Sequence, residues 1–381
     1  MLKDVHQIAA AVAAQNAAEV DREARFPEEF LVEAKKAKLL GAYVPTELGG
    51  LGCGISDLSA MCTALAQSCS ASGMVLAMHH IQVACLVHHG LGTPELRSYL
   101  SDLAERQLLI ASVTSEVGVG GDMRSSVCAL EVGPRGYALT KDATTISYGQ
   151  QADDLLITTR RSPDASSSDQ LLVLVRNADF TLERKSSWDT IGMRGTCSPS
   201  FRVSARVDAN HVLAVPFADI ASQTMVPVSH ILWASTWLGI AAGAVHRAGT
   251  FVREQARRTP GVVPPTALRL AEAWSELQIM RSGVRELGTE YQELLRSPEG
   301  LQQTLTVAFA LKVNNLKLAA SRQVVDIVQL ALLICGIAGY KNDSRFSLGR
   351  QLRDAHSAAL MVGNDRILTT NASLLLVLKD D

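Results

Sequence analysis

The spacing of apolar residues divides the chain into three regions. Residues 1–107 show apolar positions at helical spacing, separated by turns such as the glycine-rich stretch 44–52. Residues 108–222 show short apolar runs between polar turns, and 201–207 alternates every second residue, which predicts strands. From residue 223 to residue 381 the helical spacing returns. The pattern therefore predicts an N-terminal helical domain, a middle β-sheet domain and a C-terminal helical domain, an α+β fold that is mostly helical.

Three long helices are predicted in the C-terminal region. The first runs from about Pro227 to Arg258, where the sequence Thr-Pro-Gly ends it. The next two carry apolar residues three or four positions apart, over 270–294, including Trp274, and over 305–327. Consecutive helices with such stripes bury them against one another, so an antiparallel bundle is expected.

Composition narrows the classes of function. Of 381 residues, 47% are apolar and 19% are charged, with a formal net charge of −2. This balance offers no basic surface for nucleic acid or for an anionic membrane. Seven cysteines without a CxxC pair argue against a disulfide framework or a structural zinc site. The most apolar run, 327–340, is shorter than the roughly 20 residues that span a bilayer. We therefore expect a cytoplasmic protein without a membrane span.

Two histidine pairs and two tryptophans are candidates for the core. His79-His80 and His88-His89 have no Cys or acidic partner at metal-ligand spacing, so core or pocket-lining roles are predicted and no metal site is expected. Trp233 and Trp237 are four residues apart and are expected to pack in the bundle.

A glycine-bearing loop, 115–125, lies at the start of the β region. Glycines let a backbone approach a bound group, although taken alone such a loop is more often an ordinary tight turn. This segment is similar to the acyl-CoA dehydrogenase signature Thr-Glu-Pro-x-x-Gly-Ser-Asp. Further segments resemble the same family in the same order, and together they cover nearly the whole chain: Gly136–Asp153, Ile191–Pro199 and Gly336–Ala355.

The resemblance implies a fold and a cofactor. The family has an N-terminal helical domain, a middle β domain and a C-terminal four-helix bundle, usually assembled as a homotetramer, and it binds FAD. Arg257, or Arg258 beside it, would reach the FAD diphosphate of a neighbouring subunit, because a guanidinium binds two oxygens at once. The alternative is that both arginines complement the helix C-terminus. The implied cofactor contacts are Thr114, Ser115, Gly120, Gly121, Thr145, Ser147, Arg257, Thr259 and Asn364.

The chain departs from the family at the catalytic base. Where the family commonly carries a Glu near the C-terminus, this chain has Val362. Some members place the Glu on the first long helix of the bundle, and the comparable stretch 229–235 holds His230 and no acid. His230 is one candidate base, with a structural role as the alternative. Asp365 is the other candidate, and its alternative is a surface pair with Arg366.

Three functions stay open. The first is an FAD-dependent dehydrogenase that introduces an α,β double bond into an acyl thioester, of coenzyme A or a carrier protein, and passes electrons to an electron-transfer flavoprotein or to oxygen. The second is a flavin-dependent monooxygenase of the same fold, which needs no base for an α-proton. The third is a non-catalytic partner subunit, which Gly121 in place of the signature Ser and Leu333 in place of the family's Gln would suit. The density of matches favours the first, as a homo-oligomer, either a dimer or a tetramer.

Overall fold

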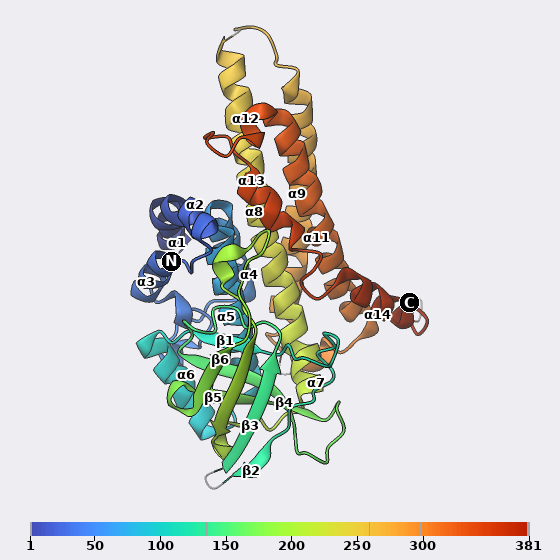
Figure 1. Ribbon diagram of the computed structural model, residues 1–381. Coiled ribbons are helices and arrows are strands. Elements are labelled where there is room, and N and C mark those ends of the chain that lie inside the picture. The colour runs from blue at the N-terminus through green and yellow to red at the C-terminus, as the bar shows by residue number, and fades with distance from the viewer. Residues whose placement is uncertain (1, 134–135, 259, 298, 379–381) are drawn as a thin grey trace.

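The computed structural model describes residues 2–133, 136–258, 260–297 and 299–378, and it has three successive parts (Figure 1). Helices come first, two small sheets follow, and long helices complete the chain, which confirms the predicted fold. Five of the six N-terminal helices share one apolar core with the sheets and the later helices, and the second, Ala14–Glu23, buries Ala17 and Val20 in a small separate cluster. The six helices are α1 (Leu2–Ile8), α2 (Ala14–Glu23), α3 (Glu28–Lys36), α4 (Ile55–Ser68), α5 (Ser70–His89) and α6 (Pro94–Arg106).

Helix α5 is buried along most of its length, because it packs against α4, α8 and β1. His79 and His80 are fully buried, and their Nε2 atoms donate to the backbone oxygens of Leu40 and Leu39 at 2.8 and 2.9 Å. This confirms the core role predicted for that pair. Among the described residues, no group of three His, Cys, Asp or Glu side chains is placed to hold a metal ion.

The middle region forms two sheets. The three-stranded sheet has the order β1-β4-β5, with β1 parallel to β4, and the four-stranded sheet has the order β2-β3-β7-β6 and is antiparallel. Strand β7 alternates buried and exposed residues as its sequence predicts, whereas β2 and β6 have no apolar run and are largely exposed. The strands are β1 (Ile110–Val113), β2 (Glu131–Gly133), β3 (Gly136–Ala143), β4 (Asp154–Arg160), β5 (Gln170–Arg176), β6 (Phe180–Arg184) and β7 (Phe201–Val207).

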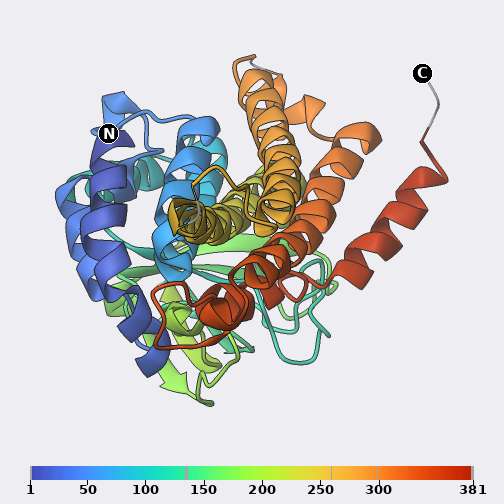
Figure 2. The ribbon, with the colours of Figure 1, turned by 90° about the horizontal axis from the view of Figure 1, so that it is seen from above.

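The three long helices predicted for the C-terminal region are present and lie side by side (Figures 1 and 2). Two residues of the predicted stripes are nevertheless exposed, Trp274 at 53% and Leu305 at 45%. The buried face of α9 passes through Ala273 and Leu277, so Trp274 faces away, and Leu305 precedes α11. The helices are α7 (Phe217–Ile220), α8 (Val226–Arg258), α9 (Thr266–Leu294), α10 (Gly300–Gln303), α11 (Val307–Cys335), α12 (Ile337–Tyr340), α13 (Gly349–His356) and α14 (Asn364–Leu375).

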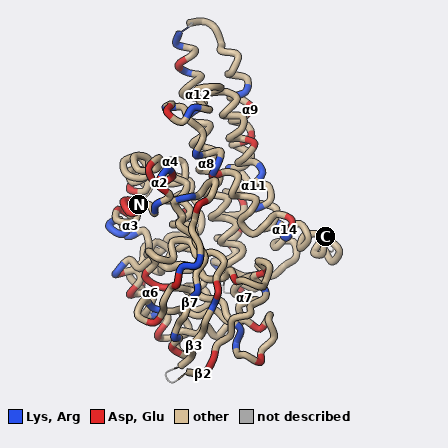
Figure 3. The backbone as a smooth tube through the Cα atoms, in the orientation of Figure 1, with Lys and Arg blue, Asp and Glu red and all other residues tan. Residues whose placement is uncertain are grey.

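Length and composition alone would let three helical segments of the described chain cross a membrane. They are Ser70–His89, Phe217–Arg258 and Val307–Cys335, and the fold buries 94%, 100% and 50% of their apolar windows. Acidic and basic residues are interspersed over the molecule, as Figure 3 shows. On α11 the exposed large apolar residue is Leu333, at 47%.

Candidate active site

Three hydroxyl-bearing residues of the β region lie together, and we call Ser115, Thr145 and Ser147 the hydroxyl wall. Ser115 follows β1, and its Oγ donates to the backbone oxygen of Thr145 at 2.8 Å. The amide of Thr145 in turn donates to Ser115 Oγ at 3.1 Å. These reciprocal bonds hold the end of β1 against the segment after β3. Two predicted cofactor contacts, 30 residues apart in the chain, are therefore neighbours.

A chain of hydroxyls extends behind Ser147. Ser198 Oγ donates to Ser147 Oγ at 3.0 Å, and Thr196 Oγ1 lies 2.9 Å from Ser198 Oγ. Because Ser147 accepts this bond, its own hydroxyl proton stays available to a ligand. Met193, three residues before Thr196, and Cys197, between Thr196 and Ser198, both have left-handed backbone conformations, with φ of 52° and 44°. Such conformations are uncommon outside glycine and concentrate at functional sites.

The glycine-bearing loop has a fixed base and an exposed tip. At its base, the buried carboxylate of Glu116 accepts from Ser126 Oγ at 2.7 Å and from the amide of Cys128 at 2.6 Å, and Lys141 Nζ lies 3.5 Å away. At its tip, Gly120 and Gly121 have φ of 58° and 79°. A Cβ at Gly120 would meet no atom within 4 Å, so the glycines serve the backbone conformation and leave open space above it.

On the C-terminal helices, the predicted site residues His230 and Asn364 lie near the buried Lys317, and we call these three residues the helical wall. His230 on α8 is buried, and its Nδ1 donates to the backbone oxygen of Val313 at 3.2 Å. Burial lowers the pKa of His230 to about 4. A carbonyl only accepts, so Nδ1 carries the proton and Nε2 keeps a lone pair. The imidazole is therefore neutral at pH 7 and held to the neighbouring helix α11.

Lys317 on α11 contacts the turn before α14. It is fully buried, and its Nζ donates to Asn364 Oδ1 at 2.6 Å and to the backbone oxygen of Val362 at 3.0 Å. Its Nζ also lies 5.9 Å from the ring of Trp237. Burial lowers the pKa of Lys317 to about 8. Asn364 is held further by Ser321, whose Oγ accepts from Asn364 Nδ2 at 3.1 Å.

The start of α14 contacts the glycine-bearing loop. Arg366 donates to the backbone oxygen of Gly120, and a Cβ at Gly121 would lie 3.6 Å from the Arg366 guanidinium. The guanidinium thus bridges to the glycine-bearing loop, and no ion pair with Asp365 is seen between these two described residues. Asp365 is exposed in the first turn of α14. Val362, in the position of the missing Glu, has a left-handed φ of 45°.

The predicted diphosphate contacts lie elsewhere. Arg257 is exposed at the C-terminal end of α8, and Thr259 falls outside the described residues. At about 1.5 Å of rise per residue, Arg257 is about 40 Å along α8 from His230. Within one copy of the chain, these two residues cannot contact the same part of a ligand. The prediction for Arg257 therefore requires a second copy.

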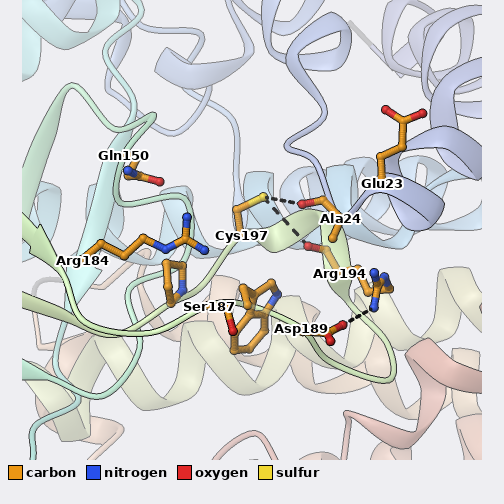
Figure 4. Close-up of a pocket in the computed structure, with 10 residues that line it drawn as sticks. Glu23, Ala24, Gln150, Arg184, Ser187, Asp189, Arg194 and Cys197 are labelled. Atoms are coloured by element: carbon orange, nitrogen blue, oxygen red, sulfur yellow. Dashed lines mark hydrogen bonds and ion pairs between the residues drawn. The ribbon is translucent and has the colours of Figure 1, made fainter.

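A pocket of about 470 Å³ opens between the end of α2 and the segment after β6 (Figure 4). Arg184, Cys197 and Gln150 approach one another in it, and Asp189 pairs with Arg194 at 3.0 Å. Its lining mixes both charges, and none of the predicted site residues that the structure describes belongs to it. We therefore assign the candidate site to the hydroxyl and helical walls.

These walls fit a flavin ring. The ring carries carbonyl oxygens and nitrogens that accept hydrogen bonds, and Ser147 and the exposed amides of the glycine-bearing loop supply donors. The open space above Gly120 lets a flat group approach the backbone. Sequence reasoning missed Lys317, Ser198 and the Glu116–Lys141 pair. The only signal for Lys317 was a basic residue on a helix otherwise rich in apolar residues.

Comparison with known families identifies the class of protein. The acyl-CoA dehydrogenase N-terminal domain matches residues 1–107, and the acyl-CoA dehydrogenase C-terminal domain matches residues 220–373. The chain belongs to the acyl-CoA dehydrogenase family, and it is an oxidoreductase of that class.

Individual relatives differ in the reaction they carry out. Amino sugar nitrososynthase DnmZ of Streptomyces peucetius is 26% identical over 356 residues, which cover 90% of this chain and 84% of the relative. Cyclohex-1-ene-1-carbonyl-CoA dehydrogenase of Syntrophus aciditrophicus is 24% identical, and the match covers 98% of this chain and 89% of the relative. The structure of FMN-bound TdsC from Paenibacillus sp. A11-2, a dibenzothiophene monooxygenase, matches with a TM-score of 0.84 at 21% identity. The match covers 98% of this chain and 96% of TdsC, and it shows a likeness of fold.

Proposed function

We propose that this protein is a flavin-dependent monooxygenase. The observation that carries the proposal is the absence of an acid at both positions where the family places its base, Val362 and the stretch 229–235. Dehydrogenation of an acyl thioester needs a base within reach of the α-proton and with a suitable pKa. A monooxygenase has no such requirement, so the helical wall suits oxygenation better than dehydrogenation.

An amine is the substrate class that we propose. The nitrososynthase among the relatives supports this choice. A bound flavin would supply the two electrons that oxygen activation needs, after reduction by a separate NADH-dependent reductase. One oxygen atom of O₂ goes to the amine nitrogen to give a hydroxylamine. The other leaves as water after taking up two electrons and two protons, so atoms and charge balance.

The residues of the chain bind and orient the reactants. Within the hydroxyl wall, Ser147 donates to the flavin ring with a proton that Ser198 leaves free, and Ser115 holds Thr145 in place. His230 and Lys317 are buried, and a helical side that excludes water favours coupled oxygenation over loss of reducing power. His230, neutral through its low pKa, offers the lone pair of Nε2 to a proton of the substrate amine.

We also propose a homo-oligomer that binds FAD in preference to FMN. Only a second copy brings Arg257 to the diphosphate, which FMN lacks. Exposed apolar residues on the bundle support an interface there, because isolated apolar surface of this extent is costly in water. They are Leu268, Trp274 and Ile279 on α9, Leu333 on α11, and Ile337 and Tyr340 on α12.

Oxygen uptake tests the proposal. The purified protein is mixed with FAD, a flavin reductase, NADH and an amino sugar, and catalase distinguishes oxygenation from peroxide formation. We expect substrate-dependent uptake that catalase does not return, with a product one oxygen atom heavier. FMN in place of FAD should support less uptake at equal concentration. Uptake that is the same with and without substrate, or fully returned by catalase, would refute the proposal.

A second candidate function is dehydrogenation with His230 as the base. The lone pair on a neutral His230 favours it. In that case a saturated acyl-CoA would reduce the flavin without oxygen, and His230→Ala would abolish the reduction. His246→Ala, at an exposed histidine on the same helix, is the matched control. Reduction that survives His230→Ala would remove His230 as the base.

A further inference from the structure

Lys317 is a buried cation that packing does not explain. It is 0% exposed, and no ion pair between Lys317 and a carboxylate is found among the described residues. Its hydrogen-bond acceptors are neutral: the Val362 carbonyl at 3.0 Å and Asn364 Oδ1 at 2.6 Å. Burying an ammonium group without an anion is costly, and an apolar side chain of the same length would fill the space more cheaply. A cation retained at this position therefore calls for a specific role.

The turn that Lys317 binds is strained. Val362 has a φ of 45°, which is a rare conformation for a β-branched residue because its side chain crowds the backbone. Such a residue stays in this conformation only where its surroundings hold it. The bond from Lys317 to the Val362 carbonyl fixes the strained residue itself, and the bond to Asn364 fixes the other end of the turn.

The Val362 turn also contacts the glycine-bearing loop, through Arg366. Arg366, four residues after Val362, donates to the backbone oxygen of Gly120. The tip of that loop is exposed, and its other printed anchors lie on the β side, such as the bond from Gln170 Nε2 to the Met123 backbone oxygen at 3.1 Å. A continuous series of contacts therefore runs from Lys317 through the turn and Arg366 to the backbone that would face the flavin.

We propose that Lys317 is a positioning residue that locks the Val362 turn and, through Arg366, holds the glycine-bearing loop in place over the flavin site. The inference rests on the proposed function only in taking the site to be a flavin site. It predicts that Lys317 and Arg366 act on one element, so that losing both is no worse than losing either. It also predicts that a residue comfortable at positive φ reduces the need for the lysine.

Flavin titration of four variants tests these predictions. Lys317→Met and Arg366→Ala should each raise the FAD dissociation constant at least tenfold, and the double variant should raise it no further. Adding Val362→Gly to Lys317→Met should recover most of the loss, because glycine adopts the left-handed conformation without strain. Ser321→Ala, which removes the other anchor of Asn364 but leaves Val362 held, is the control and should change affinity by less than threefold.

Hydrogen exchange of residues 117–125 without flavin separates this inference from the proposed function. We expect faster exchange at the loop in Lys317→Met and in Arg366→Ala, and slower exchange again when Val362→Gly is added to Lys317→Met. Wild-type-like exchange in Lys317→Met would overturn the inference even if the protein is a flavoenzyme. Faster exchange in a protein that binds no flavin would support the positioning role and reject the proposed function. Additive losses of affinity in the double variant would also overturn it.

Discussion

Two fully buried lysines, one on the β side and one on the helical side, show how differently the two sides of the site are built. Lys141, behind the glycine-bearing loop, lies 3.5 Å from the buried carboxylate of Glu116 and donates to the backbone oxygen of Thr158 at 2.7 Å. Lys317 has only neutral acceptors. Burial lowers the pKa of both, but at Lys141 the Glu116 charge opposes that effect.

We take the charge of Lys141, which is paired with Glu116, to be structural, and the unpaired charge of Lys317 to serve function. A compensated ion pair gives the β side a rigid base from which the hydroxyl wall and the glycine-bearing loop project. An uncompensated cation on the helical side costs stability, and natural proteins keep such features where activity requires them. Both sides carry departures from the family, Gly121 on the β side and Val362 on the helical side, and we propose that the departure at Val362 decides the chemistry.

Removing Lys141 should have the largest effect on stability. Lys141→Met leaves the carboxylate of Glu116 buried without a cation, and breaking a buried pair in this way costs about 3–5 kcal/mol. Urea unfolding followed by circular dichroism measures the loss. Lys185→Met, which removes an exposed partner of Glu183, should cost far less, because water screens an exposed pair. Equal losses in the free energy of unfolding for the two variants would show that the buried Glu116–Lys141 pair does not stabilise the fold more than an exposed pair does.

Lys317→Met should change the pH dependence of stability by an intermediate amount. The folded pKa of Lys317 is about 8, below the unfolded value of about 10.4, so between these values the unfolded chain binds more protons. Wild-type stability therefore rises with pH in this window, and its charge penalty is fully present below pH 8. The wild type should gain up to about 3 kcal/mol relative to the variant, since one pKa unit is about 1.4 kcal/mol. Parallel stability curves from urea unfolding between pH 7 and pH 11 would contradict an uncompensated charge.

Ser198→Ala should have the smallest effect, and it tests the hydroxyl wall. Ser198 leaves Ser147 with a free proton to donate, and one neutral hydrogen bond contributes about 1 kcal/mol, or about fivefold in affinity. Flavin fluorescence gives the dissociation constant. Ser200→Ala is the control, because Ser200 bonds Ser186 on the exposed side of the same segment. A larger effect at Ser200 than at Ser198 would reject the orientation assigned to Ser147.

Local patterns predicted the order of the fold well, because apolar periodicity reports burial directly. The prediction for Trp274 was wrong, because the buried stripe of α9 passes through its neighbour Ala273 and leaves Trp274 exposed. Motif resemblance placed Ser115 and Thr145 in one region, and the structure shows them bonded to each other. Their roles toward a flavin stay predictions.

The contacts that join the walls were beyond sequence reasoning. Lys317 donates to the Val362 carbonyl, 45 residues away in the sequence, and Arg366 donates to the Gly120 carbonyl, 246 residues away. Long-range pairings of this kind leave no local pattern, and a lysine in a helix is ordinarily an exposed residue. The backbone strain at Val362 was equally hidden, because valine gives no hint of a positive φ in its sequence.

Anaerobic titration of the flavin-loaded protein with saturated acyl-CoA thioesters of several chain lengths tests the central claim most directly. The claim is that the helical wall, with Val362 in place of the acid, removes no α-proton. The predicted result is a flavin spectrum that stays oxidised with every thioester, while dithionite reduces it fully. Bleaching by any of these thioesters in proportion to the amount added would contradict the account.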